Sequence, residues 1–191
     1  MKEKLRKGII EKRRKQTKEE NRKKSKEIKD KLFNLKEYKE AKAILFYISY
    51  NGEVFTHDII KEALKEKLVV VPISKKDRSL ILSELKKWGD LEVGSYRILE
   101  PKKDAVKKVS IDKIDLIIVP SIALDEKGNR LGHGKGYYDR LLKNINVPIV
   151  ALVFEFQMIK SVPSKKQDIP VNMIITEKRI INCKNFKLQF L

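Results

Sequence analysis

Continuous apolar runs alternate along the chain with segments in which apolar residues recur at helical spacing. The runs long enough to form one buried strand each are 43–48, 68–72, 114–120 and 147–153. A strand that is apolar at successive positions is typical of a sheet covered on both faces, because neighbouring side chains point to opposite sides. Shorter strands are expected at 79–85, 96–99 and 171–175. Helices are expected at 56–65, with Thr56 as N-cap, and at about 137–143.

The first forty residues are expected to form two helices. Leu5 and Ile9 fall one turn apart among cations, which predicts a first helix over 2–15. Thr17 is followed three residues later by Glu20, the spacing of a capping box in which each side chain bonds to the other residue's backbone amide. A second helix should follow to about residue 35. Its inner stripe would consist of Ile28, Leu32 and Leu35.

Buried strands that alternate with helices favour an α/β fold. We expect a three-layer sandwich, in which a mostly parallel central sheet carries helices on both faces. Residues 1–40 should add a basic helical extension that packs on this α/β core. A length of 191 residues fits one domain spanning 1–191, and no internal repeat or low-complexity linker divides the chain.

The formal net charge of +18 indicates an anionic partner without naming it. Residues 1–42 hold 18 of the 44 Lys and Arg residues but only 8 of the 26 Asp and Glu residues, so the positive excess is densest at the start. Nucleic acid, a membrane surface and a small polyanionic substrate all fit such a charge. This segment lacks interleaved exposed aromatics and any known base-reading motif, so no specific nucleic acid is expected as a partner.

The rest of the composition fits a cytosolic protein. No apolar run approaches the ~18–20 residues that span a bilayer, and no secretory signal follows the basic N-terminus. The only cysteine, Cys183, cannot form an internal disulfide, as is usual in a reducing cytosol. Abundant Lys, Glu and Ile with little Gln resemble the proteins of hot-adapted organisms. We therefore expect a cytoplasmic monomer without membrane partners.

The segment with the clearest chemistry is the glycine-rich loop 130–139. Its glycines are Gly132, Gly134 and Gly136. Residues without Cβ let backbone amides approach a ligand closely and adopt positive φ. Amides that point the same way, followed by a helix N-terminus, form a site for an anion such as phosphate. Arg130 and Lys135 would add full charges to this site.

This loop differs from both common nucleotide-binding motifs. A Walker loop requires Ser or Thr after its last glycine and lysine, but Tyr137 follows Gly136 here. A dinucleotide-binding loop requires G-x-G-x-x-G directly after a strand, whereas about ten residues separate this G-x-G-x-G from the strand before it. Asp139 could either compensate a helix dipole or hold Mg²⁺ beside phosphates. Tyr137 and Tyr138 fit a core role as well as a site role.

Residues 119–140 resemble the signature of the 5-formyltetrahydrofolate cyclo-ligases, also called methenyltetrahydrofolate synthetases. The resemblance extends along nearly the whole chain, to K-x-x-L-R at 2–6, E-V-x-T at 53–56, Ile59-Ile60, Glu100-Pro101, Gln157, Pro163, Asp168 and Thr176-Glu177. It implies a ligase that forms a C–N bond and depends on ATP and Mg²⁺. Such an enzyme converts 5-formyltetrahydrofolate, or its polyglutamylated forms, to 5,10-methenyltetrahydrofolate. ADP and phosphate are released, through a phosphorylated formyl intermediate.

The resemblance also implies roles for residues on the nucleotide side. The ATP-binding residues would be Lys2, Arg6, Arg130, Leu131, Gly132, His133, Gly134, Lys135, Gly136, Tyr137 and Tyr138. Lys135, Arg130 and Tyr137 would be catalytic, and Lys135 would contact the transferred phosphoryl group. Without the resemblance, Lys2 and Arg6 would simply belong to a solvated basic helix face.

On the other side of the site, the resemblance implies the folate and metal contacts. The folate would contact Ile48, Glu53, Tyr96, Gly134 and Tyr137. Glu53 would bind the donor groups of the pterin, and Asp139 and Asp168 would position Mg²⁺. His133 occupies a variable position of the family pattern, so no catalytic histidine is inferred. Asn172 stands where an acid is common, which weakens any case for a third carboxylate at the metal.

Two other functions fit parts of the sequence. One is a basic nucleic-acid-binding protein that uses the N-terminal helices, since such a charge attracts phosphates at low salt. The other is a different kinase or phosphosugar enzyme with the same phosphate loop. A pterin-sized pocket containing Glu53 and Tyr96 would distinguish the folate enzyme from the second of these.

Overall fold

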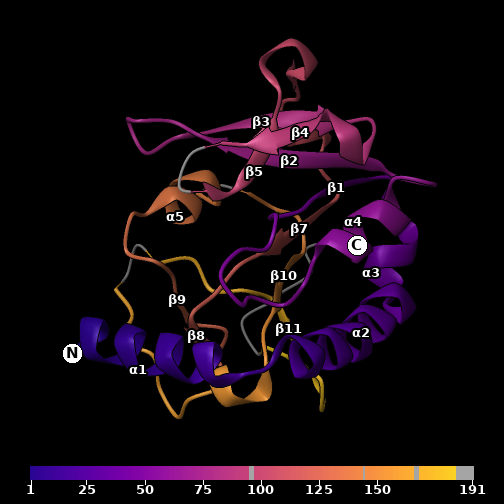
Figure 1. Cartoon of the computed structure of the whole chain (residues 1–191). Helices are drawn as coiled ribbons and strands as arrows, with labels where there is room; N and C mark the ends of the chain where they lie inside the picture. The colour runs from indigo at the N-terminus through magenta and orange to yellow at the C-terminus, as the bar shows by residue number, and fades with distance from the viewer. Residues whose placement is uncertain (95–96, 144, 166–167, 184–191) are drawn as a thin grey trace.

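A large central sheet organises the structure, a computed structural model that describes residues 1–94, 97–143, 145–165 and 168–183 (Figure 1). Within those ranges the sheet has eight strands. In spatial order these are β12 (Ile180–Asn182), β11 (Met173–Ile175), β10 (Ile149–Leu152), β7 (Leu116–Val119), β1 (Ala43–Leu45), β2 (Leu68–Ser74), β3 (Leu80–Leu85) and β6 (Lys107–Lys108).

The neighbouring strands from β11 to β2 run parallel to one another. β12 at one edge, and β3 and β6 at the other, are added antiparallel. Every residue of β1, β7 and β10 is buried, as expected for parallel strands that are covered on both faces. The prediction of a mixed α/β fold with a mostly parallel sheet is therefore confirmed.

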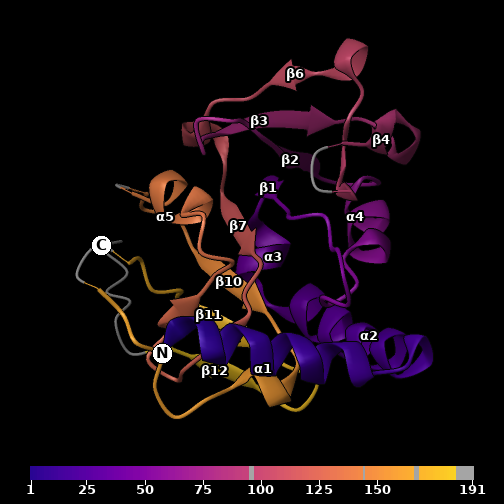
Figure 2. The same cartoon turned by 60° about the vertical axis from the view of Figure 1, so that its left-hand side comes forward.

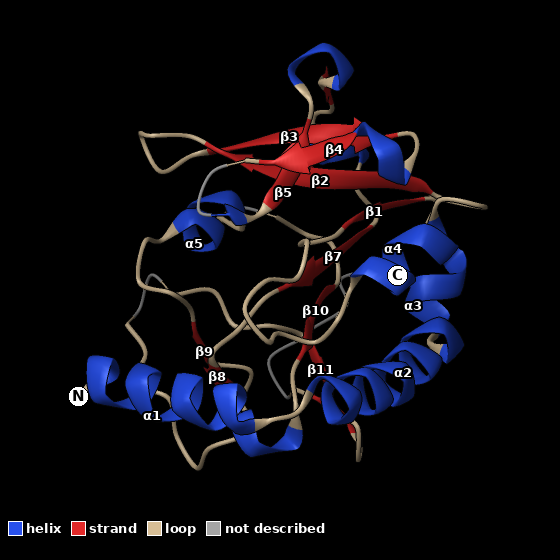
Figure 3. Cartoon of the chain, viewed as in Figure 1, coloured by secondary structure: helices blue, strands red, loops and turns tan. Residues whose placement is uncertain are grey.

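Helices α2 (Lys18–Asn34), α3 (Lys36–Glu40) and α4 (His57–Ala63) pack on one face of this sheet (Figure 3). Ile28 and Leu32 of α2 are fully buried in a cluster with strand residues such as Ile44. Each fully buried side chain of this size contributes about 1.5–3 kcal/mol. The predicted inner stripe of the second helix is thus the face that meets the sheet.

The predicted capping box is present at the start of α2. The Thr17 hydroxyl accepts the backbone N–H of Glu20 at 3.1 Å, and the Glu20 carboxylate accepts the backbone N–H of Thr17 at 2.8 Å. The bond from the Thr17 backbone N–H, and a second from the Thr17 hydroxyl to the same carboxylate, lower the pKa of Glu20 below its usual value. The two bonds from backbone N–H groups satisfy amides that the first turn of a helix leaves without partners, so α2 begins where the sequence predicts.

The opposite face of the sheet is covered differently. Leu45, Ile117 and Ala151 point into a second buried cluster, which includes Leu142 just after α5 (Tyr137–Leu141). The 3-10 helix Ile111–Lys113 and loops supply other side chains of this cover. A second complete layer of helices, as predicted from the sequence, is not confirmed.

Helix α1 (Lys2–Lys15) lies against the small hairpin formed by β8 (Ala123–Leu124) and β9 (Arg130–Leu131). Ile9 is buried there in a cluster with Ile122, Ala123, Leu131 and Val162. The hairpin turn is closed by Asp125, whose carboxylate accepts the backbone N–H groups of Lys127 and Asn129. Helices α1 and α2 follow one another along one edge of the molecule (Figures 1 and 2). The basic first helix therefore adjoins the strand that leads into the glycine loop.

A second hairpin, formed by β4 (Leu91–Val93) and β5 (Leu99–Pro101), has its own two-stranded sheet. The sequence predicts a strand at 96–99, but residues 95–96 lie outside the described residues and β5 begins at Leu99. Short helices of the 3-10 type are also found at Trp88–Asp90, Lys103–Ala105 and Glu155–Gln157. No described helix is both long enough and apolar enough to cross a bilayer.

The predicted strand over 43–48 and the predicted cap at Thr56 both turn out differently. β1 ends at Leu45, and residues 46–48 are buried but lie beyond this strand, although the N–H of Phe46 still donates to the carbonyl of Val70 in β2. The Thr56 hydroxyl does not cap α4, because it donates to the carbonyl of Tyr47 and accepts the N–H of Ser49, both at 2.9 Å. These bonds tie the end of the 49–55 segment back to the segment that follows β1. The helix predicted at 137–143 is α5, which ends at Leu141.

Candidate functional site

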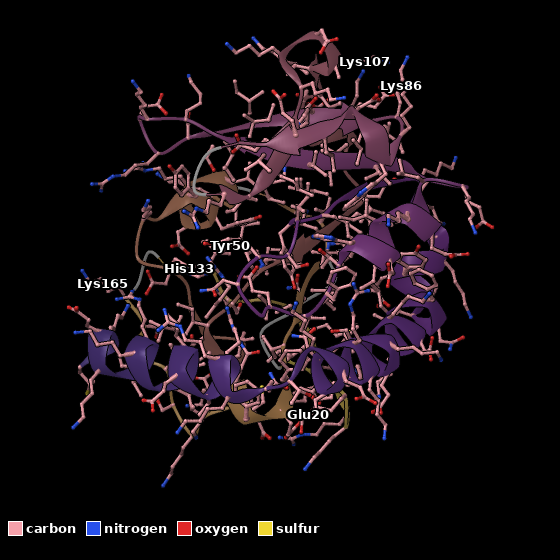
Figure 4. All side chains as sticks on the ribbon, viewed as in Figure 1. Glu20, Tyr50, Lys86, Lys107, His133 and Lys165 are labelled. Atoms are coloured by element: carbon pink, nitrogen blue, oxygen red, sulfur yellow. The ribbon has the colours of Figure 1, made fainter. Side chains whose placement is uncertain are left out.

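A cavity of about 540 Å³ opens between α1, the glycine loop, α5 and the segment after β1. The predicted site residues that line it are Lys2, Arg6, Ile48, Glu53, Arg130, Leu131, Gly132, His133, Gly134, Lys135, Gly136, Tyr137, Tyr138, Asp139 and Asp168. Tyr96, the remaining predicted folate contact, lies outside the described residues. Figure 4 labels Tyr50, His133 and Lys165, which reach this cavity from three separate segments.

The glycine loop has a backbone that other residues would not adopt easily. Gly134 and Gly136 have φ of +90° and +72°, in the left-handed region that favours glycine. A Cβ at Gly132 would lie 2.9 Å from Nη1 of Arg130, and a Cβ at Gly134 would lie 3.2 Å from Nη2 of Arg6. Side chains at these two positions would therefore displace cations that belong to the site.

Arg130 is buried behind the loop, with 4% of its side chain exposed. Its Nη2 donates to Oδ1 of Asp139 at 2.7 Å, and its Nη1 donates to the carbonyl of Pro120 at 3.4 Å. Its guanidinium also lies 5.7 Å from the ring centroid of Tyr138. These contacts join β9 to the first turn of α5, so Arg130 holds the two ends of the loop together and orients Asp139.

Helix α1 brings two further cations to the loop. Nε of Arg6 donates to the carbonyl of Gly132 at 2.9 Å. Nζ of Lys2 lies 3.2 Å from Oδ2 of Asp168, which also accepts the N–H of Lys165 at 2.8 Å. Burial raises the pKa of Asp168, but the bonds from Lys165 and Lys2 outweigh it, so this pKa lies below its usual value. Asp168 is therefore a charged carboxylate at neutral pH.

Glu53 lies at the cavity with only 9% of its side chain exposed, in the segment between β1 and α4. Its Oε2 accepts the backbone N–H of Tyr50 at 3.0 Å. Its Oε1 lies 3.2 Å from Nε2 of His133 and 3.7 Å from Nη1 of Arg13. A carboxylate that is anchored in this way can accept hydrogen bonds from the N–H groups of a ligand.

Apolar side chains complete the cavity, namely Tyr47, Ile48, Tyr50, Pro72, Leu80, Ile98 and Leu99. Burial raises the pKa of the Tyr47 and Tyr138 hydroxyls, so both stay neutral. Sequence reasoning found only Ile48 among these apolar residues. Ile98 and Leu99 have no local pattern that separates them from core residues, because they reach the cavity only through the packing of the β4–β5 hairpin.

The sequence of the chain can be compared with models of known protein families. A model described as the 5-formyltetrahydrofolate cyclo-ligase family matches residues 1–177. The chain belongs to this family. The matched range contains every residue that lines the cavity, from Lys2 to Asp168. As a cyclo-ligase, the protein is an enzyme of the ligase class.

Individual proteins similar to this cyclo-ligase carry matching names. A 5-formyltetrahydrofolate cyclo-ligase of Haemophilus influenzae is 32% identical over 145 residues, which cover 72% of this chain and 77% of that protein. The structure of the Aquifex aeolicus 5,10-methenyltetrahydrofolate synthetase superimposes with a TM-score of 0.86 at 34% identity, covering 100% of this chain and 96% of that one. The synthetase from Mycoplasma pneumoniae gives a TM-score of 0.76 at 25% identity, covering 92% and 98%.

Four carboxylates line the cavity of this cyclo-ligase, those of Glu53, Glu100, Asp139 and Asp168, and the last two are the predicted metal ligands. Within the described ranges, no group of three or more His, Cys, Asp or Glu residues could hold a metal ion. Carboxylate oxygens suit Mg²⁺, which commonly takes one or two of them together with phosphate oxygens and water. The donor set therefore fits a magnesium ion that is bound together with a phosphate ligand.

Proposed function

We propose that this cyclo-ligase converts 5-formyltetrahydrofolate to 5,10-methenyltetrahydrofolate, using ATP with Mg²⁺ and releasing ADP and phosphate. The observation that carries the proposal is the combination, in one cavity, of a cationic glycine loop with the largely buried carboxylate of Glu53 and an apolar wall. The loop suits a triphosphate. The carboxylate and the apolar wall suit a flat heterocycle that has N–H donors.

On the nucleotide side, the loop amides and the cations of α1 would bind the phosphates of ATP. Lys135 is exposed near the tip of the loop, and it would contact the phosphoryl group that is transferred. Arg130 would hold the two ends of the loop together. Tyr137, the first residue of α5, would be the third catalytic residue. Phosphoryl transfer depends mainly on positioning and on stabilisation of charge, which these groups can supply.

On the folate side, Glu53 would accept hydrogen bonds from the pterin. Ile48 and the neighbouring apolar side chains would pack on the ring, and Gly134 and Tyr137 would lie where the two substrates meet. The contact between His133 and Glu53, at 3.2 Å, links the glycine loop to the carboxylate that we propose for folate binding. The two halves of the cavity are therefore adjacent, as a direct transfer between two substrates requires.

The reaction would proceed through a phosphorylated formyl group. The formyl oxygen attacks the γ-phosphorus, and the bond from this phosphorus to the bridging oxygen breaks, which releases ADP. The formyl carbon becomes electrophilic, and its oxygen becomes part of a leaving group. The second folate nitrogen then attacks this carbon and loses its proton to solvent, the carbon–oxygen bond breaks, and phosphate departs.

Asp139 and Asp168 are the residues we propose for magnesium. When bound with ATP, the ion would neutralise charge on the phosphate oxygens. Arg130 orients Asp139, and Lys2 and the Lys165 amide orient Asp168, so both carboxylates are held at the cavity before any ligand arrives. Lys2 would therefore both bind the nucleotide and orient the carboxylate of Asp168.

The proposed activity can be tested with the full-length chain. The protein is mixed with 5-formyltetrahydrofolate, ATP and Mg²⁺, and the absorbance of the methenyl product is followed. Product should form only with ATP, and chelation of Mg²⁺ should stop it. A Glu53→Gln variant should bind ATP normally and form little product. An absence of ATP-dependent product at every temperature at which the protein stays folded would overturn the proposal.

Several predictions about the whole chain also stand as proposals. We propose that residues 1–191 form one domain, because Ile28 and Leu32 of the N-terminal segment belong to the same core cluster as the central strands. The monomeric state, the cytoplasmic location and the adaptation to heat remain predictions from the sequence. Light scattering, cell fractionation and thermal unfolding, respectively, would measure them.

A further inference from the structure

The proposed reaction gives no role to Arg13, a buried arginine in the last turn of α1. Only 2% of its side chain is exposed, and it lines the cavity. Taking a guanidinium out of water is costly unless other groups compensate its charge. Its neighbour Arg14 is exposed on the same helix, so the burial of Arg13 is specific to that position.

The guanidinium of Arg13 is directed toward the carboxylate of Glu53. Its Nη2 donates to the carbonyl of Ser121 at 3.1 Å, which anchors one side of the fork. Its Nη1 lies 3.7 Å from Oε1 of Glu53, a separation that makes an ion pair rather than a hydrogen bond. Its Nε is buried and has no hydrogen-bond partner among the described residues. Arg13 therefore balances the negative charge of Glu53, and its Nε keeps one N–H that no described residue accepts.

The aliphatic part of Arg13 also packs on the segment that carries Glu53. Gly52 has φ of +76°, and a Cβ there would lie 3.0 Å from Cγ of Arg13. From α2, Nδ2 of Asn21 donates to the carbonyls of Gly52 and Glu53, at 3.2 and 3.1 Å. The backbone of Glu53 is thus held by α2, while its carboxylate faces the cation from α1.

We propose that Arg13 is a positioning residue for the folate: its guanidinium orients the Glu53 carboxylate so that the carboxylate can accept the N–H donors of the pterin. This inference rests on the folate-binding role proposed for Glu53. Arginine suits the task because it keeps its charge at all working pH values, and because its planar fork reaches Ser121 and Glu53 together. His133 also contacts the Glu53 carboxylate, but it is exposed on the glycine loop, whereas Arg13 is buried.

The test is direct binding of 5-formyltetrahydrofolate to the full-length chain, measured by calorimetry without ATP. Arg13→Met removes the charge and keeps much of the volume. It should raise the folate dissociation constant about 10- to 100-fold, the size of one lost charge-assisted contact. The dissociation constant of ATP should change less than about twofold. Arg14→Met makes the same change of charge one residue along, outside the cavity, and should leave folate binding unaltered.

A double-mutant cycle with Glu53→Gln separates positioning from general damage. In the Glu53→Gln background, Arg13→Met should weaken folate binding little further, because it acts through the carboxylate. Independent effects that multiply would overturn the inference, as would an equal loss of ATP affinity. If Arg13→Met does not fold, Arg13→Gln keeps a donor for Ser121 and removes the charge. It must then weaken folate binding at least about tenfold, the low end for one lost charge-assisted contact, and unchanged binding overturns the inference.

The same measurements distinguish this inference from the proposed function. A wild-type chain that does not bind 5-formyltetrahydrofolate would contradict the proposed function itself. A wild-type chain that binds it, together with an Arg13→Met variant that binds it equally well, would contradict the role of Arg13 alone. Arg13→Lys should bind folate with an affinity between those of wild type and Arg13→Met, since the charge returns without the fork.

Discussion

The cations of the glycine loop have different surroundings, although they are close in the sequence. Arg130 is buried and bonded to Asp139, so it belongs to the framework of the loop. Lys135 is exposed near the loop tip and lines the cavity. A group that stabilises charge on a moving phosphoryl group must reach it from the cavity. Lys135 is therefore the residue whose loss should affect the chemical step most.

We predict that Lys135→Ala lowers turnover about 10²- to 10³-fold, which is the effect of losing one preorganised electrostatic group. The rate is measured from the methenyl product at saturating ATP and folate. Lys127→Ala is the matched control, because Lys127 is an exposed lysine in the nearby hairpin turn and does not line the cavity. An unchanged rate for Lys135→Ala would contradict the proposal that Lys135 contacts the transferred phosphoryl group.

At the scale of elements, α1 is the helix that touches both halves of the cavity. Lys2 and Arg6, near its start, contact Asp168 and the glycine loop. Arg13, near its end, faces Glu53. Arg6 and Arg13 are separated by about two helical turns, or ~10 Å along the axis, so one rigid element spans the distance from the proposed phosphate site to the proposed folate site. The basic charge of α1 is thus partly a set of site contacts.

Removal of residues 1–6 should raise the apparent KM for ATP about tenfold, because the charge-assisted contacts of Lys2 and Arg6 are lost together. A pair of double variants makes the test sharper. Lys2→Met with Arg6→Met should reproduce the effect of the deletion. Lys4→Met with Lys7→Met changes the charge of α1 equally at exposed positions and should leave the KM unaltered. Equal ATP requirements in all these proteins would contradict a role for the start of α1.

At the scale of the whole molecule, the topology places the site where separate segments converge. The β9–α5 loop, the segment after β1, the β4–β5 hairpin and α1 all line one cavity. Its cations also account for part of the charge of +18 that first suggested a polyanionic partner. A nucleic-acid-binding protein would instead use its basic surface as a whole. The two functions can therefore be distinguished by the salt dependence and the sequence preference of oligonucleotide binding.

We predict that the protein binds oligonucleotides only weakly and without sequence preference. Such binding should fall steeply between about 50 and 200 mM salt, as expected for contacts with phosphates alone. Fluorescence anisotropy with labelled oligonucleotides of several sequences measures this. One sequence bound about 10³-fold more tightly than the others at physiological salt would favour the nucleic-acid alternative.

Features with a local physical cause could be predicted from the sequence. The runs at 114–120 and 147–153 contain β7 and β10, because successive apolar residues require cover on both faces. The capping box at Thr17 needs only residues three apart. The glycine loop could be recognised because three closely spaced glycines are typical of a backbone with positive φ, which Gly134 and Gly136 have. These signals depend on neighbours in the chain, so the sequence alone determined the buried strands, the start of α2 and the position of the glycine loop.

Features that depend on contacts between distant segments were decided by the tertiary structure. Thr56 has the residue type of a cap, but the hydroxyl bonds to the segment after β1, since packing brings that backbone closer. Arg13 looked like any other cation of a basic helix, and only the fold buries it beside Glu53. Ile98 and Leu99 join the cavity through the docking of their hairpin. Local spacing carries no record of such contacts, because burial and charge pairing arise only when the whole chain has folded.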